Sequence, residues 1–250
     1  MFTFQRANAK LKKLEKRTGQ KVYSASLIAG YSCPHAQDCL SKAVRDEVTG
    51  KTHVEDGLET VFRCFSASQE AQYPNTFNER MNNFNLMRGL SVDDMISEIS
   101  VPTRAEIIRL HVSGDFFNRA YMEAWLEVAR NNPNKIFYGY TKSLPFWVGL
   151  KDKIDRTDNF ILTASWGGRR DDLIEEHGLR SARVVYSEDV AHQIGLEIDS
   201  DDFHAYDPEN SYRSFALLIH GMQPKGSEAG KAVRELKGRG SYGSRSVVHA

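Results

Sequence analysis

Three cysteines are the residues of this sequence whose type and position best suit metal chemistry. Cys33 and Cys39 lie in the segment CPHAQDC, and Cys64 follows in the segment VFRCF. Thiolates are soft ligands that bind zinc and iron–sulfur clusters. A structural zinc site takes four ligands, which the three cysteines and either His35 or His53 would supply. An iron–sulfur cluster also prefers four thiolates, so three cysteines would leave one iron open.

The spacing of the cysteines by itself leaves several interpretations open. It is neither the C-x2-C pair of a zinc ribbon nor the C-x3-C-x2-C triplet of radical enzymes that cleave S-adenosylmethionine. An odd number of cysteines does not favour a disulfide framework. Free cysteines also occur as small buried hydrophobic residues, a role that suits Cys64 in the segment VFRCF.

A second group of polar residues follows an apolar run that ends near residue 112. His111, Ser113, Gly114 and Asp115 form the segment HVSGD. Histidine and aspartate at this place suit acid–base catalysis or metal ligation, and we predict His111 and Asp115 as catalytic residues. In the alternative interpretation, Asp115 caps the helix that begins near Asn118 and His111 fills a core position with its hydrogen bonds satisfied.

Polar residues also follow the next two apolar runs. Tyr140 and Lys142 come after one run, and Ser165 ends another. Ligands of parallel α/β folds bind at the carboxyl ends of the strands. We therefore predict that these three residues, together with Ser113 and Gly114, contact a cofactor.

The segment WGGRR, residues 166–170, places two glycines and two arginines after a predicted strand. Backbone N–H groups of a glycine turn and a neighbouring arginine would hold a phosphate or carboxylate. The alternative is an ordinary turn between a strand and a helix, followed by surface arginines.

Short apolar runs and amphipathic stretches alternate along the chain, and these elements must position the polar residues. The first predicted strand covers 22–30, and the later ones cover 106–112, 135–141, 159–165, 182–187 and 214–220, with 203–207 as a weaker candidate. Predicted helices at 118–131 and 145–155 lie between them. This alternation predicts a parallel sheet of six or seven strands. It favours a partial or degenerate (β/α) TIM-like barrel over an open doubly wound sheet.

The cysteines occupy an irregular stretch, 31–66, which we expect to be a loop after the first strand. Loops of this length in compact domains are usually functional or anchored. Apolar spacing further predicts helices at 4–18, 67–88 and 91–99. We expect 1–224 to form a single α/β domain with an N-terminal helix, and 225–250 to form a basic, glycine-rich C-terminal helix or tail.

Three segments together resemble the phage gene-product-eighty-eight family. They are SLIAGYSCPHAQDC, FRCFSASQEAQYPN and RLHVSGDFFNRAYMEAWLEVARNNPNKIFYGYTKS, and the similarity spans roughly 22–190. The resemblance implies a fold similar to the partial barrels of radical S-adenosylmethionine enzymes, with a cysteine loop after the first strand. It further implies that Cys33, Cys39 and Cys64 bind an iron–sulfur cluster of the 3Fe-4S or 4Fe-4S type. The cysteine spacing and the lack of a Gly-Gly-Glu segment after the second strand argue against S-adenosylmethionine as a cofactor.

The charge distribution adds a prediction about partners. The 33 basic and 33 acidic residues cancel, which excludes a globally basic nucleic-acid coat protein. The stretch 6–22 nevertheless carries seven basic residues and one acidic residue, and 225–245 carries six and two. Basic termini suit nucleic acid as a partner, whereas solvated helix faces and a mobile tail are the alternative explanation.

We therefore expect a phage-type iron–sulfur protein of the host cytoplasm, with a redox, enzymatic or structural role and an unknown substrate. No apolar run is long enough to span a bilayer, and the N-terminus lacks the apolar core of a signal peptide. Two other functions remain open. One is a binding module for nucleic acid or a host protein that uses a structural metal, and the other is a zinc-dependent enzyme that modifies nucleic acid.

Overall fold

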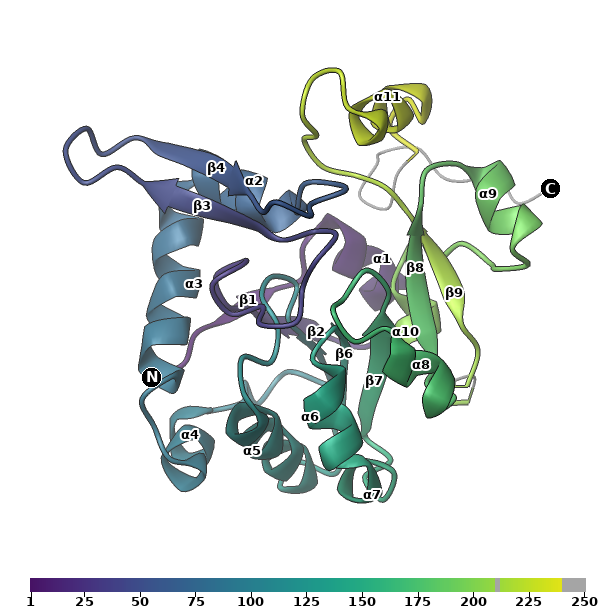
Figure 1. The fold of residues 1–250 in the computed structure, drawn as a ribbon. Coiled ribbons are helices and arrows are strands. Elements are labelled where there is room, and N and C mark those ends of the chain that lie inside the picture. The colour runs from purple at the N-terminus through teal and green to yellow at the C-terminus, as the bar shows by residue number, and fades with distance from the viewer. Residues whose placement is uncertain (210–211, 240–250) are drawn as a thin grey trace.

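A seven-stranded, mostly parallel sheet forms the centre of the molecule (Figure 1). The computed structural model describes residues 1–209 and 212–239. The strands, in spatial order, are β1 (Phe4–Arg6), β2 (Val22–Ala25), β5 (Ile107–Leu110), β6 (Ile136–Thr141), β7 (Phe160–Ser165), β8 (Ser181–Val185) and β9 (Phe215–Leu218). β1 is antiparallel to β2, and every other neighbouring pair is parallel. The parallel strands follow one another in chain order, unlike the reversed order of a doubly wound sheet.

Helices cover the outer face of this sheet and enclose the larger core (Figure 1). They are α3 (Pro74–Met87), α4 (Val92–Glu98), α5 (Arg119–Arg130), α6 (Leu144–Gly149), α7 (Lys151–Ile154) and α8 (Asp172–Glu176). Ile108, Phe137 and Leu162 point to this side and share the core with Trp125 of α5. Successive strand residues point to opposite faces, so Ile107 contributes to a different core from Ile108.

The inner face of the sheet is covered by two helices from distant parts of the chain. They are α1 (Ala9–Thr18) and α10 (Phe203–Tyr206). Leu11 and Leu14 of α1 pack with Ile107, Tyr138 and Phe215 of the strands. The N-terminal helix is therefore part of the inner core.

The predicted α/β class and the mostly parallel sheet are confirmed. β1 and β9 are the two edges of the sheet. The strands within 1–209 and 212–239 thus do not close into a barrel. No helix in this part of the chain is both long and apolar enough to cross a membrane.

Several predicted elements have different boundaries or types. The predicted helix at 4–18 begins only at Ala9, because Asn8 caps it by accepting hydrogen bonds from the N–H groups of Lys10 and Leu11. Residues 4–6 instead pair with β2. The predicted helix at 67–88 is two helices, α2 (Phe65–Gln72) and α3, because Pro74 favours extended backbone at the preceding residue. The candidate strand at 203–207 is the helix α10.

The stretch 31–66 contains a β-hairpin that the sequence pattern did not predict. β3 (Ser41–Arg45) pairs with β4 (Thr52–Asp56), and the hairpin projects from the molecule in Figure 1. Its turn is stabilised by Asp46, whose side chain accepts hydrogen bonds from the N–H groups of Val48 and Thr49. The stretch 31–66 is thus irregular only where it belongs neither to the hairpin nor to the first turn of α2.

The C-terminal part begins with a helix that packs on the sheet. Ala229 and Ala232 of α11 (Glu228–Glu235) share a core with Val185 and Leu218, and α9 (Glu188–Gln193) contributes Ala191. The domain boundary between residues 224 and 225 stays a prediction. Residues 240–250 of the predicted basic tail lie outside the described residues.

Candidate functional site

One cavity of about 190 Å³ at the carboxyl ends of the strands brings the predicted site residues together. The ten residues that line it among others are Cys33, Cys39, Cys64, His111, Ser113, Gly114, Asp115, Tyr140, Lys142 and Ser165. They come from the segment after β2, from the start of α2 and from the ends of β5, β6 and β7. Their shared location was expected from the parallel topology, whereas their individual roles stay predictions.

The three cysteines approach the cavity from two segments. Cys33 and Cys39 lie between β2 and β3, and Cys64 immediately precedes α2. All three are free thiols. Burial raises the pKa of Cys33 well above its ordinary value, and the neighbouring Asp115, Cys64 and Cys39 raise it further. Burial and the nearby Cys39 raise the pKa of Cys64 to about 12.

The described side chains offer no preformed centre for a single metal ion. Within 1–209 and 212–239, no three His, Cys, Asp or Glu side chains are grouped so that they could hold one ion. The site therefore shows three thiols at one cavity without a preformed single-ion centre.

The glycine turn after β7 holds the cysteine segment in place. The carbonyl oxygen of Gly167 accepts hydrogen bonds from the N–H groups of Gln37 and Asp38. The N–H groups of Gly167 and Gly168 both donate to the carboxylate of Asp171. Because that carboxylate occupies both N–H groups, the structure favours the interpretation of WGGRR as a structural turn over that of a phosphate site.

Gly114 allows the end of β5 to pack closely against the start of the cysteine segment. Its φ is +82°, and a Cβ there would lie 2.5 Å from Oγ of Ser32 and 2.8 Å from Cβ of Leu27. The N–H of Leu27 also donates to the carbonyl oxygen of Ser113. Only glycine combines this conformation with so little space.

Asp115 joins the ends of β5 and β6 and does not cap α5. The cap is Asn118. One oxygen of Asp115 accepts hydrogen bonds from Thr141 Oγ1 at 2.6 Å and from the N–H of Phe116, and the other accepts from the N–H of Lys142 at 2.8 Å. Burial raises the pKa of Asp115 to about 6, although these hydrogen bonds oppose the rise.

His111 is a buried, neutral imidazole, and one of its ring nitrogens lacks a partner in the part of the chain that the structure describes. Its Nε2 lies 3.4 Å from the hydroxyl of Tyr121, whereas Nδ1 has no hydrogen-bond partner among the described residues. Burial and the nearby Arg109 lower the pKa of His111 to about 3. Its φ of 58° is uncommon for a residue with a side chain, and such backbone conformations cluster at active sites and ligand-binding sites. His111 is thus buried as the core alternative expects, but one ring nitrogen has no described partner, so its role stays a prediction.

Lys142 supplies positive charge to the cavity. It is 8% exposed, and its Nζ donates a hydrogen bond to Ser165 Oγ at 2.6 Å. No carboxylate of the described chain forms an ion pair with this ammonium group. Two of its N–H donors are thus available for a ligand.

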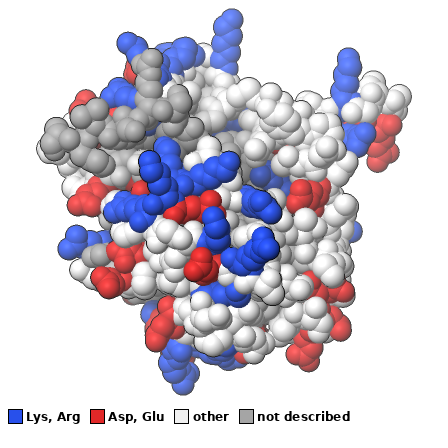
Figure 2. All heavy atoms as spheres, turned by 180° about the vertical axis from the view of Figure 1, so that it is seen from behind, with Lys and Arg blue, Asp and Glu red and all other residues white. Residues whose placement is uncertain are grey.

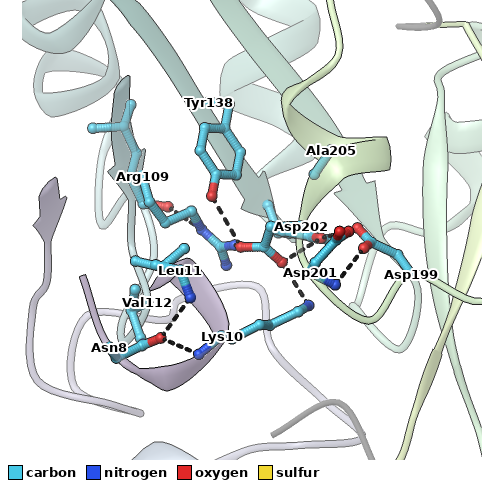
Figure 3. A network of polar contacts seen from close by, with 12 residues as sticks. Asn8, Lys10, Leu11, Arg109, Val112, Tyr138, Asp199, Asp201, Asp202 and Ala205 are labelled. Atoms are coloured by element: carbon cyan, nitrogen blue, oxygen red, sulfur yellow. Dashed lines mark hydrogen bonds and ion pairs between the residues drawn. The ribbon is translucent and has the colours of Figure 1, made fainter. Parts of the chain in front are cut away.

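A buried ionic network that sequence patterns did not indicate borders the same cavity (Figure 3). Asp202 forms ion pairs of 2.5 Å with Lys10 of α1 and with Arg109 of β5. The hydroxyls of Tyr138 and Tyr140 donate to the same carboxylate at 3.0 and 3.1 Å. Arg109 and Lys10 hold the pKa of Asp202 well below its usual range, against the effect of burial. The basic N-terminal stretch gave no signal that one of its lysines is buried.

Glu70 of α2 is a second buried acid that the sequence analysis missed. It is 0% exposed, and its carboxylate accepts hydrogen bonds from Arg80 Nη1 at 2.9 Å and from Ser113 Oγ at 2.7 Å. It also accepts one from the N–H of Ala29. Glu70 thereby links α2 and α3 to both the cysteine segment and the end of β5.

Comparison with known proteins places the chain in a family. The sequence profile of the family described as gene product 88 matches residues 2–237. The chain belongs to the gene product 88 family. The predicted phage resemblance is thus confirmed, while the similarity to radical S-adenosylmethionine enzymes stays a prediction.

The Gene 88 protein of Mycobacterium phage L5 is a relative of this gene product 88 family member. The two are 24% identical over 169 residues, which cover 62% of this chain and 62% of the phage L5 protein. No solved structure matches the chain. The cavity of this chain is therefore the basis for any proposal about its chemistry.

Proposed function

We propose that this gene product 88 protein binds an iron–sulfur cluster of the 3Fe-4S or 4Fe-4S type through Cys33, Cys39 and Cys64. The observation that carries the proposal is the arrival of three thiols, from two separate segments, at one cavity. In a cluster each thiolate binds a different iron, so the thiols surround the cluster and need not converge on one point. We place this activity in the host cytoplasm, on a sheet that we interpret as a partial (β/α) barrel.

The electrostatics of the thiols support a positively charged occupant. Burial and mutual repulsion disfavour thiolates at Cys33 and Cys64. Bound metal ions reverse this preference, because a coordinating thiol is deprotonated outright. The three cysteines therefore suit a cluster in two ways. Thiolates are preferred ligands of iron, and positively charged irons would stabilise the thiolate form in this buried place.

The remaining cavity residues suit a substrate beside the thiols. An iron–sulfur cluster supplies redox chemistry and, at an iron without a protein ligand, a Lewis-acid position. His111 would donate or accept a proton at Nδ1, and Asp115 would act as a second proton-transfer group. Lys142 and Ser165 would hold a negatively charged or hydrogen-bonding group of the substrate, with Ser113, Gly114 and Tyr140 completing the walls.

Anaerobic purification of the full chain tests the proposal. We expect a brown protein that contains both iron and acid-labile sulfide, with an electron paramagnetic resonance signal that distinguishes the two cluster types. A colourless protein with stoichiometric zinc would assign the site to zinc. A protein that stays folded and metal-free after anaerobic reconstitution would overturn the proposal.

Variants of the cysteines identify the ligands. Cys33→Ala, Cys39→Ala and Cys64→Ala should each lose most of the iron and the visible absorbance, because a lost thiolate leaves two protein ligands. Ser165→Ala is the matched control, since it changes the cavity wall without removing a thiol. If a cysteine variant contains as much iron as Ser165→Ala, the replaced cysteine is not a ligand of the cluster.

A further inference from the structure

A basic groove lies beside the N-terminal helix, outside the cysteine cavity. It has a volume of about 340 Å³, and Arg6, Lys12, Lys21 and Arg104 line it together with a single acid, Glu15. The four cations are exposed, and no carboxylate of the described residues forms an ion pair with any of them. One carboxylate oxygen of Glu15 accepts a hydrogen bond from the N–H of Val22. The groove therefore presents excess positive charge to a ligand.

The surrounding surface adds to this charge. Lys13 and Lys16 of α1 are also exposed and lack an ion pair with any described residue. Figure 2 shows Lys and Arg side chains gathered near the centre of the face opposite to the view of Figure 1, with acidic side chains between some of them. A polyanion that crossed this groove would have several cations within reach.

A second hollow adjoins the basic groove at Arg6, which lines both. It has a volume of about 540 Å³ and is lined by the amide side chains of Gln5, Gln69 and Gln72 and by the ring of Tyr73, among others. Tyr73 is 51% exposed, so its ring is accessible to a ligand. The Nε2 of Gln5 donates to Glu79, whereas its buried Oε1 has no hydrogen-bond partner among the described residues. The hollow is thus lined both by an acceptor without a described partner and by an exposed aromatic ring.

The same hollow is separated from the cysteine cavity by a thin wall. Phe65, Val112 and His220 line both spaces. A group bound in the amide-lined hollow would therefore lie next to the proposed cluster site.

We propose that these two hollows bind single-stranded nucleic acid, with phosphates over the basic groove and a base in the amide-lined hollow. Glutamine amides form hydrogen bonds with base edges, and aromatic rings stack on bases. An acidic peptide would explain the cations of the groove but would leave the ring and the amides without a purpose. The inference is independent of the cluster, because none of the cysteines lines either hollow.

Binding of a fluorescein-labelled single strand of about 12 nucleotides, followed by anisotropy, tests the proposal with the full chain. We expect binding at low salt that weakens linearly on a log–log plot as salt rises, because bound phosphates release counterions. The double variant Lys12→Glu/Lys21→Glu should bind at least about tenfold more weakly, with a salt slope reduced by about 0.7 for each phosphate that the variant no longer binds. The matched control is Lys51→Glu/Lys231→Glu, which reverses two exposed lysines outside both hollows and should bind like the original chain.

An abasic strand tests the base site. The original chain should prefer the normal strand to the abasic strand by about tenfold, and Tyr73→Ala should remove most of this preference through the loss of stacking. Circular dichroism confirms that each variant is folded. Unchanged binding by the Lys12→Glu/Lys21→Glu variant, or the absence of any binding at low salt, would overturn the proposal. Equal competition by poly-glutamate would overturn it in favour of an acidic peptide. Retained binding by Cys33→Ala would show that this site does not depend on the cluster.

Discussion

Burial determines which groups of the cysteine cavity carry charge. His111 is neutral because burial and the charge of Arg109 both oppose protonation of its ring. The thiols of Cys33 and Cys64 keep their protons because burial and neighbouring acidic groups oppose formation of a thiolate. Asp115 differs, since burial and hydrogen bonds act on it in opposite directions and its pKa is raised only to about 6. Asp115 is therefore the cavity acid that changes its charge near neutral pH.

The raised pKa of Asp115 predicts a specific pH dependence of stability. The folded protein binds this proton more tightly than the unfolded chain, so the contribution of Asp115 is largest below pH 3.8 and falls as pH rises to about 6. The change corresponds to about 3 kcal/mol of unfolding free energy. Urea denaturation should show the original chain losing stability relative to Asp115→Asn between pH 4 and 7. Parallel pH curves for the two proteins would contradict this prediction, and Asp155→Asn, at an exposed position, is the control.

The residue types of the site could be predicted because chemistry restricts them strongly. Cysteine, histidine and aspartate at strand ends stand out in any α/β sequence, and all ten predicted residues line one cavity. Lys10, Asp202 and Glu70 could not be identified, because nothing in a local pattern tells a buried charged residue from an exposed one. Their partners are distant in the sequence, as Lys10 and Asp202 show.

Close contacts between elements position the cysteine segment against the sheet. Gly114 at the end of β5 contacts the 27–32 segment, and Gly167 after β7 contacts Asp38. The hydrogen bonds from Gln37 and Asp38 to Gly167 add a second attachment. Two turns, one after β5 and one after β7, therefore attach the segment to the sheet on both sides of β6.

Replacement of Gly114 separates the effect of packing from that of backbone conformation. Gly114→Ala should destabilise the protein by about 2 kcal/mol more than Gly178→Ala, since overpacking adds to the cost of a positive φ. Gly178 also has a positive φ, of +57°, but no atom lies within 4 Å of a Cβ there. Thermal unfolding of both variants measures the difference. Equal losses would show that the neighbours of Gly114 move aside at little cost.

Elements with strong local signals were predicted well, and those that depend on tertiary pairing were not. The five apolar runs after residue 105 correspond to β5, β6, β7, β8 and β9, and the helix predicted at 91–99 corresponds to α4, which Ser91 caps. The strand β1 was mistaken for part of a helix, because its three residues are strand only through pairing with β2. The hairpin β3–β4 was missed because its strands are short and β4 has no buried residue.

At the scale of the whole molecule, the network around Asp202 connects the N-terminal helix with a segment about 190 residues later in the chain. It joins α1 to β5, β6 and the start of α10, all across the inner face of the sheet. Its groups are buried, so the balance of charges matters more than at the surface.

Removal of the central charge should be costly. Asp202→Asn leaves Lys10 and Arg109 without their shared carboxylate and should reduce the unfolding free energy by about 3–5 kcal/mol. Asparagine also tolerates the left-handed backbone at this position, where φ is 66°, so the loss reports the charge. Arg17→Ala removes a partly exposed ion pair with Asp201 and should cost less than about 1 kcal/mol. Urea denaturation at pH 7 compares the variants, and similar losses in both would refute a dominant role for the buried network.

The packing of the N-terminal helix α1 against late segments of the chain has a consequence for synthesis of the protein. Arg17 and Asp201, which pair across the inner face, are 184 residues apart. At the usual rate of translation, roughly 10–40 s pass between the synthesis of the helix and that of its partner. During this time Leu11 and Leu14 have no completed core to enter, since Phe215 is made later still. The apolar face of α1 therefore stays uncovered through most of translation, and the inner core can close only after nearly the whole sheet has been made.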